Sequence, residues 1–273
     1  MAKHPLRLAI EAGATEDELL SLIAPDAIIY PPMLTTPVSG REIVGRILAA
    51  AARIAGPIEY EHELSDGKQT FLIWKGSVGG FTLGAVTILT ENADGLISEV
   101  RVVMRPWPVT TLFRDAMYAE LAGDIPAEAW ELQPKPETDG SPRQFTAVSL
   151  KDLTYSPDVV LHSPMLAKSV SGHDEVKESV GLAHQVQSAS SYTTIIATPE
   201  LVFELFDCDA DGYPMEGVWV RKLNDAGEVT DLSVYLRPYP AVTVLRDHTR
   251  ELARGSVIDS DEYWELPVRV AAA

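Results

Sequence analysis

Two histidines of this sequence could transfer protons near neutral pH, where an imidazole changes charge. His162 and the adjacent Ser163 follow a short β-rich run, and a histidine there could act as an acid or a base. The alternative is a histidine hydrogen-bonded to backbone at the end of a strand. His184 lies a little more than one helical turn after Val180, so it points either inward or to the surface. We take His162 as the candidate catalytic residue, and Ser163 and His184 as candidate ligand contacts.

Two arginines end predicted strands in which charged and apolar residues alternate. Glu99 to Arg105 shows this pattern, and Asp231 to Arg237 repeats it, so one face of each strand is polar. Such a face usually meets solvent or an interface. The functional alternative is that Arg105 and Arg237 bind a carboxylate or an enolate through paired hydrogen bonds. Tyr235 lies on the same face and is a further candidate ligand contact.

These residues belong to a repeat with a period of 132 residues (170 − 38 = 132). The repeated segments are Pro32-Met33-Leu34, Val38-Ser39-Gly40 and Arg105-Pro106-Trp107-Pro108, which return as Pro164-Met165-Leu166, Val170-Ser171-Gly172 and Arg237-Pro238-Tyr239-Pro240. Without gaps, 23 of the 91 positions from Pro25 to Asp115 match, whereas unrelated chains would match at roughly 6%. We interpret the chain as a tandem duplication in which each copy is one folding unit.

The repeat also relates aromatic residues that could line a pocket. Tyr60 corresponds to Tyr192 and Trp74 to Phe206, while Tyr30 occupies the position of His162. The candidate lining residues are Tyr30, Tyr60, His62, Trp74 and Tyr192. Aromatic residues at strand spacing also form ordinary hydrophobic core, and this alternative stays open.

Periodicity and turn residues predict an α+β unit in each copy. In the first copy we expect helices at Pro5–Ala12, Glu16–Ile23 and Thr110–Leu121, a helix capped by Ser39 and Glu42, and strands at Ala27–Tyr30, Ile58–Leu64, Thr70–Val78, Phe81–Leu89 and Ile97–Met104. In the second copy we expect a helix capped by Ser171 and Asp174, strands at Tyr192–Ala197, Leu201–Phe206, Met215–Leu223 and Val229–Leu236, and a helix at Val242–Ala253. The predicted boundaries are residues 1–132 for the first domain, 133–143 for the linker and 144–273 for the second domain.

Composition narrows the functional classes. The 273 residues carry a net charge of −18, with 22 Lys and Arg scattered along the chain, so binding to nucleic acid is disfavoured. Without a long apolar run or a signal peptide, we expect a cytoplasmic protein that does not bind membranes. A single cysteine, Cys208, excludes an internal disulfide. Asp207 to Gly212 resembles the opening of a calcium loop, but the twelfth position is Val218 and not Glu, so we interpret it as an acidic hairpin and expect no metal.

The order of elements resembles the nuclear transport factor 2-like superfamily. The segments YPPMLTTPVSGREIV and HSPMLAKSVSGHDEV, with MRPWP and LRPYP, resemble its SnoaL-like branch most. The resemblance spans nearly the whole chain and implies two cone-shaped units, each a curved, mainly antiparallel sheet around a largely apolar pocket. It also implies that the copies pair through their sheets as an intramolecular pseudo-dimer, with further homo-oligomers open.

The ketosteroid isomerases of that superfamily allow a direct comparison. Their general base corresponds to Pro31 and Ser163, and their oxyanion-hole acid to Thr87 and Trp219. Their helix tyrosine corresponds to a position near Leu6. None of these residues can take the role concerned, so we do not expect steroid isomerisation by that mechanism.

Two functional hypotheses remain. The first is a protein that binds a small apolar molecule with an oxygen function. Such a protein could act as an acid–base isomerase, cyclase or lyase that needs no cofactor. The second is a noncatalytic binding or assembly module whose pockets are filled by side chains. The size of the cavity in each cone distinguishes them.

Overall fold

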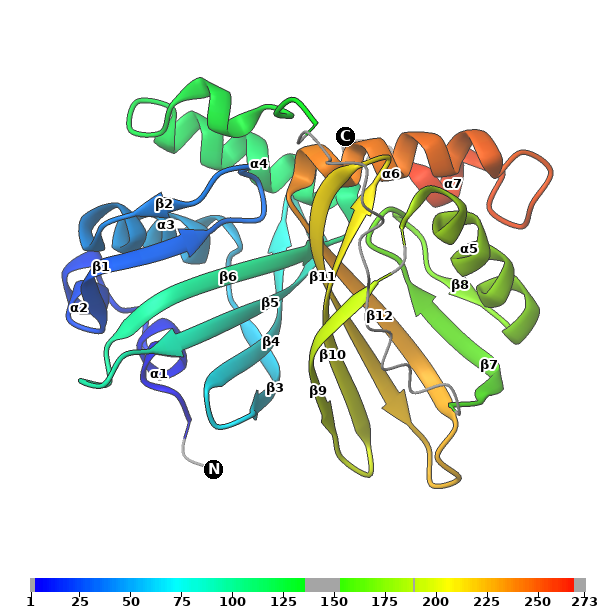
Figure 1. The fold of residues 1–273 in the computed structure, drawn as a ribbon, viewed down its shortest axis with the longest axis horizontal. Helices are drawn as coiled ribbons and strands as arrows, with labels where there is room; N and C mark the ends of the chain where they lie inside the picture. The colour runs from blue at the N-terminus through cyan, green and yellow to red at the C-terminus, as the bar shows by residue number, and fades with distance from the viewer. Residues whose placement is uncertain (1–2, 136–152, 189, 268–273) are drawn as a thin grey trace, which may run out of the picture.

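The computed structural model describes residues 3–135, 153–188 and 190–267 (Figure 1). We call residues 3–135 the first half and residues 153–267 the second half. The helices of the first half are α1 (Pro5–Glu11), α2 (Glu16–Leu20), α3 (Arg41–Ile54), α4 (Trp107–Leu121) and the short 3-10 helix η1 (Ala127–Trp130). Its strands are β1 (Ile23–Tyr30), β2 (Val38–Ser39), β3 (Glu59–Ser65), β4 (Gln69–Val78), β5 (Phe81–Glu91) and β6 (Ile97–Arg105).

The second half repeats these elements. Its strands are β7 (Tyr155–His162), β8 (Val170–Ser171), β9 (Ser191–Ala197), β10 (Leu201–Ala210), β11 (Tyr213–Leu223) and β12 (Val229–Arg237). Its helices are α5 (His173–Val186), α6 (Tyr239–Leu252) and α7 (Asp261–Trp264). Each of these strands begins and ends 132 residues after its counterpart, as Tyr155 does after Ile23, so the structure follows the period of the sequence. Most of the predicted linker lies outside the described residues, and the domain boundaries stay predictions.

Each half bends an antiparallel meander around its helices. Strands β3 to β6 are neighbours in order, and β1 runs parallel to β6; strands β9 to β12 and β7 repeat this arrangement. The inner face of each sheet packs on the helices of its own half and forms a separate hydrophobic core. The predicted α+β class, with a curved, mainly antiparallel sheet in each half, is confirmed.

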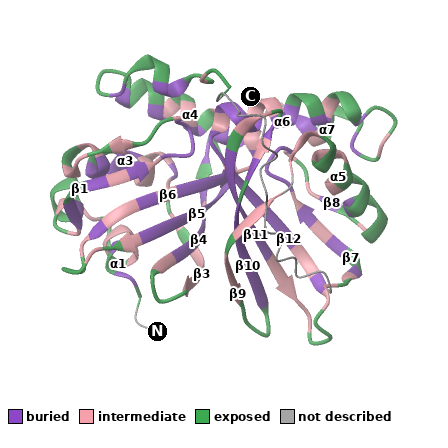
Figure 2. Ribbon diagram, in the orientation of Figure 1, coloured by how far each residue is buried: buried purple, intermediate pink, exposed green. Residues whose placement is uncertain are grey.

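The outer faces of the two sheets form a third hydrophobic cluster. Side chains from β4, β5 and β6 meet side chains from β10, β11 and β12, and the rings of Phe71 and Phe203 lie 4.6 Å apart. Figure 2 shows buried residues along the strands where the sheets meet. One antiparallel pair, Leu236 with Met104, also joins β12 to β6. That this pairing corresponds to the dimer of single-copy relatives stays a prediction.

The closing helices link the halves a second time. The backbone N–H of Trp107, at the start of α4, donates to the Pro164 carbonyl, and the N–H of Tyr239, at the start of α6, donates to the Pro32 carbonyl, each at 2.7 Å. The Trp107 and Tyr239 rings stack with centroids 5.4 Å apart. Each closing helix therefore begins against a loop of the other half.

Two expectations about helix ends are wrong. Gly40 and not Ser39 caps α3, and no side chain caps this helix. Ser39 instead belongs to β2, which pairs with β1, and the Gly40 N–H donates to the Ala27 carbonyl at 2.8 Å. Gly40 has a φ of 111°, which favours glycine. Gly172 takes the same role before α5, so the predicted Ser171 cap fails for the same reason.

Four other boundaries also differ from the prediction. Strand β1 begins at Ile23, so the helix predicted to reach that residue ends at Leu20. Both closing helices begin three residues early, because proline is tolerated in a first helical turn. Asp207 to Ala210 belong to strand β10, and the turn consists of Asp211 and Gly212, whose φ values of 49° and 81° suit a two-residue hairpin.

Candidate functional site between the two halves

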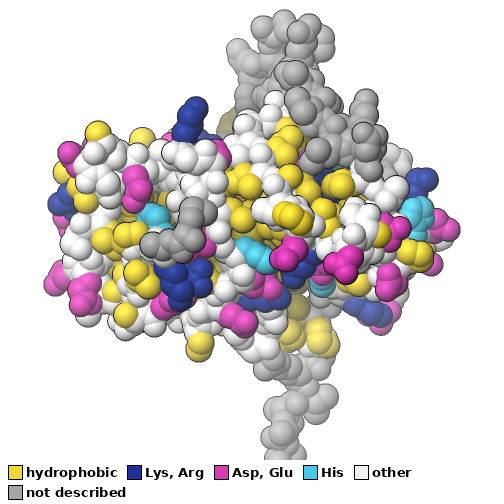
Figure 3. Space-filling model, turned by 90° about the horizontal axis from the view of Figure 1, so that it is seen from below, with side chains coloured by type: hydrophobic (Ala, Val, Ile, Leu, Met, Phe, Trp, Pro, Cys, Tyr) yellow, Lys and Arg dark blue, Asp and Glu magenta, His cyan; other side chains and the backbone are white. Residues whose placement is uncertain are grey.

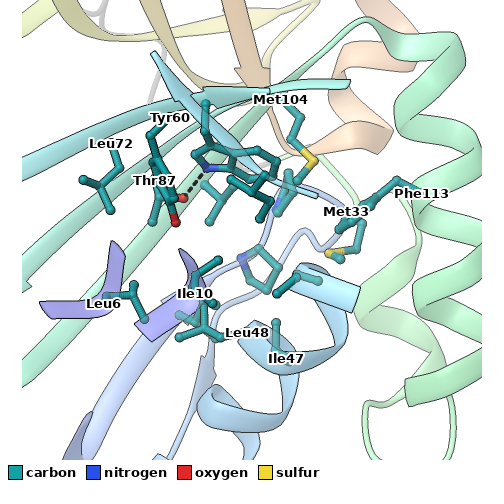
Figure 4. A pocket seen from close by; sticks show the side chains of 18 residues that line it. Leu6, Ile10, Met33, Ile47, Leu48, Tyr60, Leu72, Thr87, Met104 and Phe113 are labelled. Carbon is teal, nitrogen blue, oxygen red and sulfur yellow. Dashed lines mark hydrogen bonds between the residues drawn. The ribbon is translucent and has the colours of Figure 1, made fainter. Parts of the chain in front are cut away.

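Side chains from the helices and the sheet of the first half point toward one another in the interior of the first cone (Figure 4). A cavity of about 50 Å³ lies between α1, α3 and the inner face of the sheet. Leu6, Ile10, Ile47 and other apolar side chains surround it, together with Tyr60 and Trp74. The Trp74 indole N–H donates to the Thr87 hydroxyl at 2.9 Å, so these two polar groups satisfy each other. Ligand pockets commonly measure about 300–1,000 Å³, and this cavity is far smaller.

Leu6, Pro31 and Thr87, three positions considered in the sequence analysis, all line this cavity. No carboxylate or histidine of the described chain lines the cavity. Burial raises the pKa of the Tyr60 hydroxyl, so it stays protonated and can act only as a hydrogen-bond partner.

The interior of the second cone is more polar and equally full. Ser163, His184 and Trp219 line a cavity of about 30 Å³ there. Burial lowers the pKa of His184, so its imidazole is neutral at neutral pH. Nearby, Glu204 and Arg221 form a buried ion pair. We therefore interpret the interiors of both cones chiefly as packed cores of the fold and not as ligand pockets.

A larger groove lies between the halves, and we call it the His162 groove. Its volume is about 300 Å³. The first half contributes residues of β3 to β6, and the second half contributes β11, β12 and the end of β7. Strand β7 runs toward the middle of the molecule, which brings its last residue to this junction (Figure 1). Five of the predicted site residues line the groove: His62, Arg105, His162, Ser163 and Tyr235.

Both ring nitrogens of His162 are hydrogen-bonded within this groove. Nε2 lies 2.9 Å from Oδ2 of Asp231, and Nδ1 lies 2.8 Å from Oγ of Ser169. Asp231 comes from β12, which pairs in parallel with β7, whereas Ser169 comes from the loop before β8. The His162 and Asp231 side chains are 27% and 25% exposed, so water and small solutes can reach them.

The charge of Asp231 fixes the tautomer of His162. Burial alone would raise the Asp231 pKa, but the hydrogen bond from His162 and the charge of its protonated form, followed by Lys222 and Arg105, hold it below its usual value. The carboxylate can then only accept, so Nε2 of a neutral His162 carries the hydrogen. Nδ1 is left with its lone pair toward Ser169, which donates. The result is a hydroxyl beside a base that a third group orients, an arrangement suited to proton abstraction.

The other histidine of the groove, His62, has a lowered pKa. Burial, with the nearby positive charge of Lys222, lowers the His62 pKa, and Glu61 and Glu200 offset this only in part. Ser163 is buried, and its hydroxyl accepts from the Met165 N–H at 3.1 Å. This hydrogen bond stabilises the loop that follows β7. Arg105 lies over the ring of Tyr235 at 5.3 Å.

Three predicted residues lie elsewhere. Tyr30 sits beneath two guanidinium groups, those of Arg101 and Arg237, at 4.8 and 5.4 Å from its ring centre. Arg237 is buried beside a separate groove. Tyr192 packs against Phe206 in the second core. The sequence interpretation missed Ser169 altogether, because one serine in a loop gives no signal until the fold places it beside His162.

Several solved structures resemble this chain, each over less than half of its length. A cystatin-like protein from Silicibacter pomeroyi DSS-3, described as uncharacterized and conserved in bacteria, is 29% identical over 44% of this chain and 88% of its own, with a TM-score of 0.41. A steroid delta-isomerase from Pseudomonas aeruginosa is 25% identical over 43% and 87%, also with a TM-score of 0.41. An NTF-2 like protein of unknown function from Burkholderia xenovorans LB400 is 19% identical over 36% and 74%, with a TM-score of 0.31. No family model and no curated protein matches.

Two features are absent from the described part of the chain. Residues 3–135, 153–188 and 190–267 contain no helix that is both long and apolar enough to span a membrane. The same residues contain no group of three or more His, Cys, Asp or Glu side chains placed to hold a metal ion.

Seen from below, side chains of both charges are intermingled over the surface (Figure 3).

Proposed function

We propose that the His162 groove binds a small molecule and that His162 acts on it as a general base. The observation that carries this proposal is the fixed imidazole, with Asp231 at Nε2 and a hydroxyl 2.8 Å from Nδ1. A ligand group with an acidic hydrogen that takes the place of the Ser169 hydroxyl would lose its proton to Nδ1. The reaction class is proton abstraction that leads to isomerisation, cyclisation or elimination.

The relative size of the cavities supports this location. The groove, at about 300 Å³, reaches the lower end of the range for ligand pockets, whereas the cones hold about 50 and 30 Å³. The groove also brings together residues of both halves, so the duplicated chain contains a site that one half alone lacks.

The proposal can be tested with 5-nitrobenzisoxazole, a generic probe of proton abstraction. A base removes the hydrogen on carbon, the N–O bond breaks, and a coloured phenolate forms. We expect the protein to exceed an equal concentration of free imidazole, and His162→Asn to lose at least about 10²-fold of that rate. The control is His173→Asn, which removes an exposed histidine that also contacts an aspartate, Asp174.

Ser169→Ala distinguishes two forms of the mechanism. If the probe replaces the Ser169 hydroxyl at Nδ1, this variant keeps or raises the rate, and if Ser169 relays the proton, the rate falls. A wild-type rate in His162→Asn would refute the proposal. So would a rate no higher than that of imidazole in both the wild type and Ser169→Ala.

A second candidate function is binding of a small apolar molecule with an oxygen function in the first cone. The observation that favours it is the Tyr60 hydroxyl, which lines the cavity and makes no hydrogen bond to any described residue. A ligand oxygen would accept from it, and the volume of about 50 Å³ limits an unadjusted ligand to a few heavy atoms. We expect cyclopentanone to raise the melting temperature of the wild type and not of Tyr60→Phe. Equal shifts in the two proteins would argue against this candidate.

A further inference from the structure

The halves place two related grooves at their junction, and the two grooves differ in charge. Arg105 ends β6 at the His162 groove, and its counterpart Arg237 ends β12 at a second groove of about 320 Å³, which we call the Arg237 groove. The repeat thus provides an internal comparison, because the same backbone position carries an arginine in both grooves.

In the Arg237 groove, the protein supplies its own carboxylate. Glu216 is the cross-strand partner of Arg237, and both side chains are buried. Burial lowers the pKa of Arg237, and the charge of Glu216 counters that effect. Glu216 is ion-paired with Arg101, which also pairs with Glu99, and it acts on Arg237 through its charge rather than through a direct ion pair. Nε of Arg237, like Nε of Arg105, is buried without a hydrogen-bond partner among the described residues.

In the His162 groove, that carboxylate is missing. The cross-strand partner of Arg105 is Gly84, which occupies the position of Glu216 in the repeat. A Cβ atom at Gly84 would lie 3.2 Å from Cε1 of Tyr235 and 3.4 Å from Cγ and Nε of Arg105. The glycine leaves this space to the two side chains, and no residue in the described part of the chain forms an ion pair with Arg105.

The other charges of the groove are already matched. Glu61 lies 2.6 Å from Nζ of Lys75 and 4.0 Å from Nζ of Lys222, and Asp231 is bound to His162. Nε of Arg105 is buried without a hydrogen-bond partner among the described residues. The charge of Asp231 reaches Arg105, but this carboxylate is hydrogen-bonded to His162, so Arg105 has no carboxylate of its own in the groove.

We propose that Arg105 binds the carboxylate of a small organic acid in the His162 groove. The ligand carboxylate supplies the negative charge that Glu216 places beside Arg237 in the other groove, and the guanidinium lies over the Tyr235 ring. This inference rests on the proposed function, because it names the substrate class of the same site. The acid is held by its carboxylate while another part of it faces His162.

Binding of benzoate, with benzamide as its neutral counterpart, tests the proposal. By calorimetry on the full chain at low salt, we expect benzoate to bind at least about tenfold more tightly than benzamide, and Arg105→Gln to remove that preference. Gly84→Glu should also remove it, because the new carboxylate pairs with Arg105. Arg46→Gln, which removes an exposed cation on α3, should leave benzoate binding unchanged.

The outcomes separate this inference from the proposed function. Benzoate that binds the wild type and His162→Asn equally, but not Arg105→Gln, supports the carboxylate site even if the proton-abstraction test fails. Equal binding of benzoate and benzamide, or undiminished benzoate binding in a folded Arg105→Gln, would overturn it. Tighter binding of inorganic phosphate than of benzoate would overturn the assignment to carboxylates.

Discussion

His162 is held at both ring nitrogens, and its chemistry depends on which of them carries the hydrogen. The Asp231 carboxylate places the hydrogen on Nε2 and leaves Nδ1 free to accept. A neutral partner at position 231 would remove this constraint, since an amide can donate as well as accept. The role of Asp231 is therefore to orient the base.

Asp231→Asn should reveal this interaction in stability as well as in rate. Because the folded-state pKa of Asp231 lies below its ordinary value, its contribution is fully present above the unfolded pKa of about 3.9 and is lost as pH falls through the folded pKa. We expect the variant to be less stable by about 1 kcal/mol at pH 7, a typical net contribution of one such hydrogen bond. Urea unfolding at pH 7, 5 and 3 measures the difference.

The groups that face Asp231 determine how that experiment is interpreted. They are His162 from β7, Lys222 from β11 and Arg105 from β6. The difference between wild type and variant should be smaller at pH 3 than at pH 5, because the folded protein loses the Asp231 contribution as its carboxylate takes up a proton. A difference that grew between pH 5 and pH 3 would show that Asp231 is not stabilised as a carboxylate.

Residue type alone indicated His162 but not its partners. Ser233, and not Asp231, is the residue directly opposite His162 in the parallel pair of β7 and β12, and this register depends on the fold. Arg105 and Arg237 also appeared equivalent in the sequence. Their difference arises from Gly84 and Glu216 on the neighbouring strands, which become their partners only once the strands are paired.

At the scale of elements, the strands were the most predictable part of the fold. Their alternation of apolar residues and the turns between them are local signals, as with the two-residue hairpin at Gly79 and Gly80, both at positive φ. Helix starts were less predictable. Ser39 and Glu42 fit a capping box, yet the pairing of β2 with β1 takes Ser39 away from the helix. Tertiary pairing overrode a local preference there.

Strands β1 and β7, which run parallel to β6 and β12, also show that local sequence signals do not reveal tertiary pairing. Proline in Pro31-Pro32 correctly suggested where β1 ends, but nothing local indicated that β1 lies along β6. That pairing brings the loop after β1, and likewise the loop after β7, to the junction of the halves. The location of the candidate site follows from it.

At the scale of the whole molecule, the apolar cluster between the sheets should contribute strongly to stability. Phe203 is fully buried against Phe71 across the junction. We expect Phe203→Ala to reduce the free energy of unfolding by about 3–5 kcal/mol, since it deletes a buried aromatic ring. Chemical denaturation measures this loss.

Leu252→Ala is the matched control, because Leu252 is 44% exposed on α6 and should change stability by less than about 0.5 kcal/mol. A loss below about 1 kcal/mol in Phe203→Ala would mean that the sheets do not pack together in solution. The repeat and the alternation of charged and apolar residues pointed to an interface on this face, but left solvent as an alternative. Only three-dimensional packing places Val103 and Tyr235 inside it.

The reciprocal bonds from Trp107 to Pro164 and from Tyr239 to Pro32 bear on how such a molecule can evolve. An assembly of two identical chains carries every substitution twice. A glutamate that places its charge in one junction is therefore present in the other junction as well. A gene that encodes both copies in one polypeptide is free of that constraint. One junction can be stabilised by charged groups of the protein while the other stays open to a ligand. Selection can then alter the open junction without destabilising the first.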